Sequence, residues 1–520
     1  MLKDLSWEIA DAGIRYVFGI PGSGDSLTLI DHLQSYGVEC QITHFEGSGA
    51  VIAASYGMVS NSLGVVLAIK GPGVANLVPG LAVCSLENIP LIAISEAVSA
   101  SSTNRTVHKR IDHRYLTSGV TKENLQLDFN SGKSFFKAST IATAETPGPV
   151  LLELIDHLDK QKVGKREVKK SETKEYSSAA IDKLLTKIRQ SRKPVVIAGS
   201  AAYRAGLEGS LRCLTVPIFT TLAAKGLVDE SADYSAGIYT GAGKGNAPES
   251  RVIANADLVI GIGLRGNELL KFPPFDCPAV NIDFSCVQRS EGHEFIVKVD
   301  IENGGEIFFE LAKKEWGAEL VADSIFRLRS QLLAVDFLPA TVLETVSYHL
   351  SGACRLVVDT GFFCTVAEHV WRSTRYGEFL CSSNGRYMGT AVPMAIGASI
   401  GDSTQPTIIV TGDGGIGMYF SELRIAVERT LPVLVLFFSD GGFGSIRYVA
   451  EKRGISGGSL NMKNPSWANL LQALGMDGVV ASRLEHVSDG LKSWDKSNGP
   501  AFIECRFDPD KYSCMVNNIR

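Results

Sequence analysis

The sequence predicts an α/β protein built from three consecutive, doubly wound, mostly parallel sheets. Short apolar, β-branched runs recur along the 520 residues, with helical patterns between them. Strand, helix and strand in this spacing form parallel sheets with right-handed crossovers. Two changes in composition divide the chain into three units of similar size. At roughly 150 residues per domain, the length agrees with three or four such units.

The expected strands are the most apolar of these runs. In chain order they are residues 65–69, 91–94, 195–197, 258–262, 355–358, 408–410 and 433–438. Helical spacing of apolar residues appears at 50–58, 319–333 and 419–429. Because the strand runs are continuous, we expect sheets that are buried on both faces.

Two stretches without strand patterns set the boundaries of the units. Residues 159–184 are polar and rich in lysine, which is typical of a solvated linker. Residues 315–340 are largely helical and lead into a new strand. The expected domains are therefore residues 1–158, 185–315 and 340–520.

Charge and composition exclude several classes of protein. With 51 basic and 56 acidic residues, the formal charge is −5, so the chain lacks the basic field of a nucleic-acid-binding protein. A hydrophobic content of 45% with so little net charge excludes disorder over most of the length. The sequence is that of a folded protein whose ligands are small molecules.

The N-terminal segment and the cysteines indicate a soluble cytoplasmic protein. The first residues show no basic stretch followed by an apolar core and a cleavage site. The longest apolar runs, such as residues 431–438, fall well short of the ~20 residues that cross a bilayer. The ten cysteines are scattered without a CxxC pair, which fits reduced thiols. We therefore expect no membrane partner.

The third unit carries the most specific pattern. Two expected strands run into glycine turns, TGDGG at residues 411–415 and SDGG at residues 439–442. Asp413 and Asp440 then lie at the carboxyl ends of neighbouring parallel strands, where open α/β sheets bind ligands. Two carboxylates and turn carbonyl groups suit Mg²⁺ or Ca²⁺ holding a diphosphate, which backbone N–H groups can approach at the glycines. Ordinary strand-end turns are the alternative, and the matched pair makes it weaker.

In the first unit, one carboxylate lies among small and apolar residues. Glu46 stands in THFEGSGA, residues 43–50, at the start of a helical pattern, and KGPG follows at residues 70–73. A carboxylate in such surroundings is a candidate for a raised pKa, which lets it exchange a proton with a ring nitrogen near neutral pH. The alternative is a glutamate favoured at a helix start by the helix dipole.

Together these patterns resemble the thiamine-diphosphate enzymes of the acetolactate synthase, pyruvate decarboxylase and benzoylformate decarboxylase group, over nearly the whole chain. The matching segments are FGIPG (18–22), Glu46, GPG (71–73) with Asn76, TPGPV (146–150), TTLAAKG (220–226), YMGTAVP (387–393) and the aspartate pair. The resemblance implies a pyrimidine-binding domain, a central Rossmann-like domain and a diphosphate-binding domain, in that order.

The resemblance also implies roles for individual residues. Glu46 would hydrogen-bond the aminopyrimidine ring and favour its imino tautomer, whose nitrogen removes the thiazolium C2 proton. Met388 would hold the cofactor bent so that these atoms meet. The Arg386 carbonyl would accept a hydrogen bond from the exocyclic amine.

The resemblance further implies how the diphosphate and its metal are held. Asp413, Asp440 and the Gly442 carbonyl would bind Mg²⁺. Further cofactor contacts are expected from Pro21, Gly22, Gly71, Pro72, Asn76, Gly412, Gly414, Gly415, Phe443 and Gly444. Most relatives have asparagine where this chain has Asp440, and the extra charge should tighten Mg²⁺ binding and sharpen its pH dependence.

The central unit departs from the FAD-binding synthases of this group. Residues 239–243, YTGAG, lack the methionine-histidine-glycine sequence that is typical of those enzymes, although Arg265 matches a position near the flavin. FAD therefore stays open as a cofactor, but it is not expected.

Candidate residues for the substrate side lie in two loops. Ser23 matches a serine that benzoylformate decarboxylase places near the substrate carboxylate, and a plain turn serine is the alternative. His108, Lys109 and His113 fall in a loop that brings polar groups to the active site, where a histidine can shuttle protons. The alternative is a solvated loop. Acetolactate synthases carry phenylalanine and glutamine at the first two of these positions.

The resulting hypothesis is decarboxylation of a 2-oxo acid with thiamine diphosphate and Mg²⁺, followed by transfer of the acyl-anion equivalent to an acceptor carbonyl. A simple decarboxylase that releases an aldehyde is the alternative, favoured by the loop histidines. No complete GxGxxG opens a helix, which disfavours a nicotinamide or flavin oxidoreductase. Retention of Glu46, Met388 and Asp413 disfavours a non-catalytic subunit. In the family, the first domain of one chain faces the third domain of another, so a homodimer or homotetramer is expected.

Overall fold

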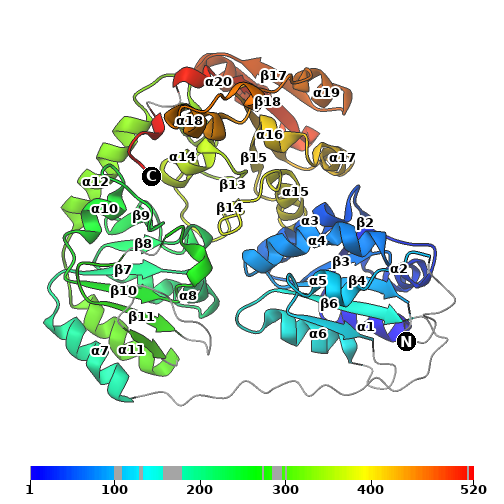
Figure 1. Cartoon of the computed structure of the whole chain (residues 1–520), viewed down its shortest axis with the longest axis horizontal. Coiled ribbons are helices and arrows are strands. Elements are labelled where there is room, and N and C mark those ends of the chain that lie inside the picture. The colour runs from blue at the N-terminus through cyan, green and yellow to red at the C-terminus, as the bar shows by residue number, and fades with distance from the viewer. Residues whose placement is uncertain are drawn as a thin grey trace.

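The computed structural model contains three six-stranded sheets that follow one another along the chain (Figure 1). It describes residues 2–98, 108–127, 133–155, 178–271, 274–283, 295–298, 301–511 and 515–520. Each pairing between strands in these ranges is parallel. The predicted α/β class is confirmed. None of the helices within the described ranges has the length and apolar composition that a membrane crossing requires.

The first sheet has the strand order β2-β1-β3-β4-β6-β5. Its strands are β1 Tyr16–Ile20, β2 Glu39–Ile42, β3 Gly64–Ala68, β4 Leu91–Ala97, β5 Glu123–Gln126 and β6 Pro149–Ile155. Its helices are α1 Leu2–Asp11, α2 Asp25–Ser35, α3 Glu46–Ser60, α4 Pro72–Leu86, α5 His113–Thr117 and α6 Ser134–Thr143. Strands β3 and β4 are buried along their whole length, as expected for apolar strands covered on both faces.

The central sheet has the order β12-β11-β10-β7-β8-β9. Its strands are β7 Pro194–Ala198, β8 Ile218–Thr220, β9 Ser235–Ile238, β10 Leu258–Ile262, β11 Ala279–Asp283 and β12 Phe295–Lys298. Its helices are α7 Ser178–Gln190, α8 Ser200–Arg204, α9 Glu208–Arg212, α10 Pro248–Ile253 and α11 Ile301–Ala312, with short 3₁₀ turns η2 Leu222–Ala224 and η3 Gly266–Glu268. Helix α12 Ala318–Leu332 leads from this domain to the third.

The third sheet has the order β14-β13-β15-β16-β18-β17. Its strands are β13 Arg355–Val358, β14 Phe379–Cys381, β15 Thr407–Gly412, β16 Val433–Ser439, β17 Asp477–Ala481 and β18 Ala501–Arg506. Its helices are α13 Pro339–His349, α14 Phe362–Val370, α15 Ala391–Gly401, α16 Asp413–Ile416, α17 Leu423–Glu428, α18 Gly444–Lys452, α19 Trp467–Ala473 and α20 Leu484–Ser493. The 3₁₀ turns are η4 Phe420–Glu422, η5 Gly458–Leu460, η6 Lys496–Asn498 and η7 Pro509–Lys511.

Two expected elements differ from the structure. Helix α7 starts at Ser178, inside the segment 159–184 that was predicted to be a linker. Its apolar residues Leu184, Leu185 and Ile188 are spaced for one helix face and pack into the central core, whereas the lysines that suggested a linker precede them in the sequence. The helix expected at 419–429 is instead a 3₁₀ turn followed by α17.

The first and third domains share one hydrophobic core. Helix α3 packs along α15 (Figure 1). Alanines of both helices, such as Ala53 and Ala395, are fully buried in the same cluster. Small side chains let the two helices approach closely, so the start of α3 is fixed relative to the third sheet. This contact determines where Glu46 lies.

Candidate active site

Two aspartates mark the carboxyl edge of the third sheet. Asp413 begins α16 directly after β15, and Asp440 follows β16, the neighbouring strand. The Asp413 carboxylate accepts the backbone N–H groups of Asp440 and Gly441 at 2.8 and 3.0 Å, and the Ser439 hydroxyl at 3.0 Å. These bonds hold the two turns together, so the aspartates predicted to bind a metal lie side by side.

The charges and donors of this pair fit a divalent cation. The pKa of Asp440 is raised to about 6, first by burial and then by the nearby charge of Asp413. Within the described ranges, no group of three or more His, Cys, Asp or Glu side chains could hold a metal alone. Two carboxylates beside the Gly442 turn therefore form an incomplete set of hard oxygen donors, which suits Mg²⁺ that also binds phosphate oxygens. Mg²⁺ would relieve the repulsion between the two carboxylates.

Glycine turns leave room beside the aspartates. A Cβ on Gly414 would lie 2.7 Å from the Phe443 ring and 2.8 Å from the Met388 sulfur, so a side chain there would have to displace these two groups. Met388 is therefore packed against the Asp413 turn. The remaining predicted cofactor residues of this domain lie on the same turns or just before Met388: Gly412, Gly415, Gly444 and Arg386. The Arg386 guanidinium is directed to Glu368, at 2.6 Å.

Asp359, which no sequence pattern singles out, fixes the turn that follows Met388. It follows β13 and is 2% exposed. Its carboxylate accepts the Gly389 N–H at 2.7 and 3.0 Å and the Thr411 hydroxyl at 3.1 Å. One carboxylate thus joins the Met388 turn to the end of β15. A single aspartate after a buried strand resembles any strand-end residue, so the sequence gives no signal of this role.

The ionisation of Asp359 predicts a pH-dependent stability. Burial raises its pKa from 3.8 to about 7, and the hydrogen bonds that it accepts offset this only in part. Between these values the folded protein keeps a proton that the unfolded chain has lost. The free energy of unfolding should therefore fall as the pH rises across this interval, by up to about 1.4 kcal/mol per pH unit. Asp359→Asn should remove this contribution, which urea unfolding of both proteins across the interval would measure. The same pH dependence in both proteins would contradict the raised pKa.

In the first domain, Glu46 begins α3 and is 6% exposed. The Asn76 amide donates to its Oε2 at 3.0 Å, and its Oε1 lies 3.2 Å from the place where a Cβ on Gly73 would be. Its side chain lies at the N-terminus of α3, and the residues around it keep most water away. The candidate catalytic carboxylate is thus held beside the glycine turn that opens α4.

His113 supports that glycine turn. It is 5% exposed, its Nε2 accepts the Gly71 N–H at 2.8 Å, and its Nδ1 lies 3.0 Å from Oε1 of Glu153. Because Nε2 accepts, Nδ1 carries the proton and donates it to Glu153. Gly71 has a φ of 70°, and a Cβ there would collide with the Lys109 carbonyl, so glycine is required. Both ring nitrogens of His113 are therefore engaged.

The other substrate-side candidates are Ser23, His108 and Lys109. Ser23 and His108 are exposed and Lys109 is half-buried. Within the described part of the chain, no hydrogen bond involves their side chains. They are free to meet a substrate, and their roles stay predictions.

A buried carboxylate holds the turn that contains Pro21 and Gly22. The Ser26 hydroxyl accepts the Gly22 N–H at 2.8 Å and donates to Glu96 at 2.7 Å. Glu96, at the end of β4, also accepts the Ser26 N–H at 3.0 Å. Sequence reasoning singled out Ser23 in this turn, but Ser26 is the serine that fixes it.

Glu87 and Glu422 join the first and third domains within the chain. Glu87 follows α4 and accepts the N–H groups of residues 383–385 at 2.8 to 3.2 Å, in the loop that leads to Met388. Glu422 is fully buried and accepts the N–H groups of residues 44 and 45 at 3.0 and 3.1 Å, immediately before Glu46. Each glutamate lies hundreds of positions from its partners, so no local pattern reveals it.

Each of the three domains matches a family of known proteins. Residues 4–116 match the thiamine pyrophosphate enzyme N-terminal TPP binding domain, residues 181–301 the central domain, and residues 359–505 the C-terminal TPP binding domain. The chain belongs to the thiamine-diphosphate-dependent enzymes. The predicted family is confirmed, and thiamine diphosphate (thiamine pyrophosphate) is its cofactor.

Relatives of this thiamine-diphosphate enzyme span nearly its whole length. A probable 2-ketoarginine decarboxylase of Pseudomonas aeruginosa is 25% identical, covering 96% of this chain and 92% of its own. The acetolactate synthase of Bacillus subtilis is 24% identical, covering 98% and 93%. The acetolactate synthase large subunit of Porphyra purpurea is 22% identical, covering 95% and 89%. Identities this low, to proteins with different reactions, leave the reaction of this chain undecided.

Glu87 gives a test of how the cofactor loop is held. Glu87→Gln should lower thiamine diphosphate affinity about tenfold, because one amide oxygen replaces two carboxylate oxygens as acceptor for the loop N–H groups. Titration with thiamine diphosphate at saturating Mg²⁺ measures this affinity. Glu485→Gln, at an exposed position of the third domain, should leave the affinity unchanged. Equal affinity in the Glu87 variant and the control would show that the loop needs no such support.

Proposed function

We propose that this enzyme decarboxylates a 2-oxo acid with thiamine diphosphate and Mg²⁺ and transfers the resulting acyl-anion equivalent to an acceptor carbonyl, as an acetolactate synthase does. The observation that carries the proposal is the pair of sites described above. The first domain holds the buried carboxylate Glu46, and the third domain holds Asp413 and Asp440 beside Met388. A proton-exchanging carboxylate and an oxygen-rich cation site are what this cofactor needs at its two ends.

The residues present divide the work of holding the cofactor. Bound thiamine diphosphate would supply the carbon nucleophile that adds to the 2-oxo group and the electron sink for decarboxylation. Glu46 would hold a proton between its carboxylate and a ring nitrogen. Asp413, Asp440 and the Gly442 carbonyl would hold Mg²⁺, and Met388 would support the cofactor from the side of the Asp413 turn.

The hydrogen bonds of the His113 ring favour transfer of the acyl-anion equivalent to an acceptor over its protonation to an aldehyde. A decarboxylase that releases an aldehyde needs a proton donor at the substrate, and both nitrogens of His113 are bound to Gly71 and Glu153. A simple decarboxylase is the second candidate. It is supported by the exposed His108 and by the relative named as a 2-ketoarginine decarboxylase.

We also propose that the active site forms between two chains, in a homodimer or homotetramer. Among the described residues, no hydrogen bond or ion pair links Glu46 to Met388, Asp413 or Asp440. The Glu46 carboxylate accepts instead from Asn76 of its own domain. Two chains could bring Glu46 of one to Asp413 of the other. Light scattering with and without thiamine diphosphate and Mg²⁺ tests this, and an active monomer would refute it.

Analysis of the products distinguishes the transferase from the simple decarboxylase. The purified enzyme with thiamine diphosphate and Mg²⁺ is given pyruvate and a panel of longer 2-oxo acids, including 5-guanidino-2-oxopentanoate, with and without aldehyde or 2-oxo acid acceptors. A ligated 2-hydroxy ketone or 2-hydroxy-3-oxo acid supports the transferase. Stoichiometric aldehyde without ligation replaces it with the decarboxylase. His108→Ala then separates them further, because it should slow aldehyde release and spare ligation.

A further inference from the structure

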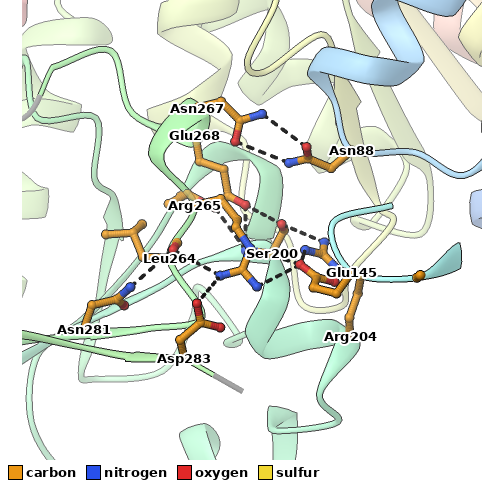
Figure 2. Close-up of polar contacts among 12 residues, drawn as sticks. Asn88, Glu145, Ser200, Arg204, Leu264, Arg265, Asn267, Glu268, Asn281 and Asp283 are labelled. Carbon is orange, nitrogen blue, oxygen red and sulfur yellow. Dashed lines mark hydrogen bonds and ion pairs between the residues drawn. The ribbon is translucent and has the colours of Figure 1, made fainter. Parts of the chain in front are cut away.

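Charged side chains fill the carboxyl edge of the central sheet (Figure 2). Arg265, which follows β10, is 1% exposed and donates to Glu145 at 3.0 and 2.8 Å. Arg204, at the end of α8, donates to the same carboxylate at 2.8 and 2.7 Å. Asp283, at the end of β11, lies 3.2 Å from Arg265. Glu145 belongs to the first domain, in the loop before β6, so that domain supplies the central anion of the network.

The turn that opens α8 is filled as well. Glu268 is 6% exposed and accepts the Ser200 N–H at 3.1 and 3.2 Å (Figure 2). It also accepts the Thr221 hydroxyl at 2.7 Å. In open α/β sheets, the phosphates of a nucleotide or flavin bind at this edge, against the strand-end turns. Here carboxylates of the chain already use the donors that such a ligand would need.

A second contact joins the same two domains. The side-chain amides of Asn88 and Asn267 exchange hydrogen bonds at 3.3 and 3.4 Å (Figure 2). Asn267 also donates to the Leu86 carbonyl at 2.8 Å. Asn267 is the neighbour of Glu268 on η3. One short turn therefore fills the edge of the central sheet and contacts the first domain.

The charges in the network stabilise one another. Burial favours the neutral form of Glu145, but hydrogen bonds and charge from Arg204 and Arg265 outweigh it and hold its pKa below the usual range. Burial likewise disfavours the Arg204 cation, and the bonds and charge of Glu145 outweigh it and raise the pKa of Arg204. Loss of Glu145 would remove the charge that Arg204 and Arg265 share and leave the buried Arg265 beside Asp283, which is destabilising.

We propose that Arg204 and Arg265 form an anion site that Glu145 occupies, so that the central domain holds the first domain in place instead of binding FAD or another nucleotide. The residues at this edge do not fit FAD, which the position of Arg265 had left open. The inference is independent of which 2-oxo acid the enzyme uses.

The first experiment titrates the wild-type holoenzyme with FAD and, separately, with ADP in a calorimeter. We expect no binding of either, because Glu145, Glu268 and Asp283 take the donors at the edge. Binding of FAD or ADP at one molecule per chain would overturn the proposal. Activity without added FAD is measured on the same sample, so failure of the thiamine reaction is seen separately.

The second experiment opens the anion site. Glu145→Ala should lower the Tm, and inorganic phosphate should raise the Tm of this variant more than that of the wild type, because phosphate can enter the vacated position between the arginines. Glu145→Gln allows the same comparison if the alanine variant does not fold. Equal effects of phosphate on variant and wild type would overturn the anion site.

A matched control lies in the central domain. Glu208 on α9 is half-exposed and pairs with Arg212 at 2.8 Å. Glu208→Ala should respond to phosphate as the wild type does. A phosphate effect in this control as large as in Glu145→Ala would show a general salt effect and overturn the assignment.

Discussion

Glu46→Gln should lower kcat by about 10²- to 10⁴-fold while the enzyme still binds thiamine diphosphate. The amide has nearly the shape of the carboxylate and keeps an oxygen that can accept from Asn76, so the fold and the cofactor pocket should survive. It cannot exchange a proton with a ring nitrogen, so the chemistry should be lost. Stopped-flow turnover with saturating 2-oxo acid, together with a cofactor titration, separates the two effects.

A control for this experiment lies in the first domain. Glu123 is an exposed carboxylate at the start of the edge strand β5, and Glu123→Gln should leave both turnover and cofactor affinity unchanged. Turnover of Glu46→Gln equal to this control would refute the role of Glu46. A loss of cofactor binding without a change in kcat at saturation would make Glu46 a binding residue instead.

The fold could be predicted from the sequence because its strands are buried on both faces. Residues 258–262 form a continuous apolar run, and residues 355–358 are apolar after Arg355; both segments form strands with these bounds. Of the strands that were not predicted, some are buried, such as β6 and β11, and others lie at the edges of their sheets. β2 and β17 are edge strands with partly exposed residues, so they lack the apolar run on which the prediction rested. The start of α7 was missed because lysine-rich composition outweighed the helical spacing of its leucines.

The candidate site was predictable where chemistry and chain connectivity coincide. Asp413 and Asp440 each follow a strand at a glycine turn, so parallel pairing alone brings them together. Asp359 and Glu87 were missed because each acts on a segment distant in the sequence, through backbone N–H groups that any residue provides. His113, in contrast, was singled out by the sequence for a role that its contacts do not favour. A loop histidine suggests proton transfer, and only tertiary structure shows Gly71 and Glu153 bound to its ring.

Asp413 should prove the residue on which metal-dependent cofactor binding depends most. It is 2% exposed, and its carboxylate ties the β15 turn to the Asp440 turn through two backbone N–H groups. Asp413→Ala removes a proposed Mg²⁺ ligand and the bonds that orient the second one. Substitution of residues that only support the metal ligands costs about 10- to 100-fold in metal affinity. Because Asp413 is itself a proposed ligand, we expect its loss to weaken Mg²⁺ binding by more than about 100-fold. Thiamine diphosphate binding titrated at increasing Mg²⁺ measures this loss.

Two further variants separate a metal role of Asp413 from a structural one. Asp440→Asn keeps an oxygen at the second ligand position, so it should bind the cofactor far better than Asp413→Ala. Asp477→Ala, at an exposed position on β17 of the same sheet, should match the wild type. If excess Mg²⁺ restores cofactor binding to Asp413→Ala while its circular dichroism stays native, the defect lies in metal affinity, as expected. If Asp413→Ala is folded and needs no more Mg²⁺ than the Asp477 control, the cation is not held at these two turns, and the diphosphate end of the cofactor must bind elsewhere on the sheet.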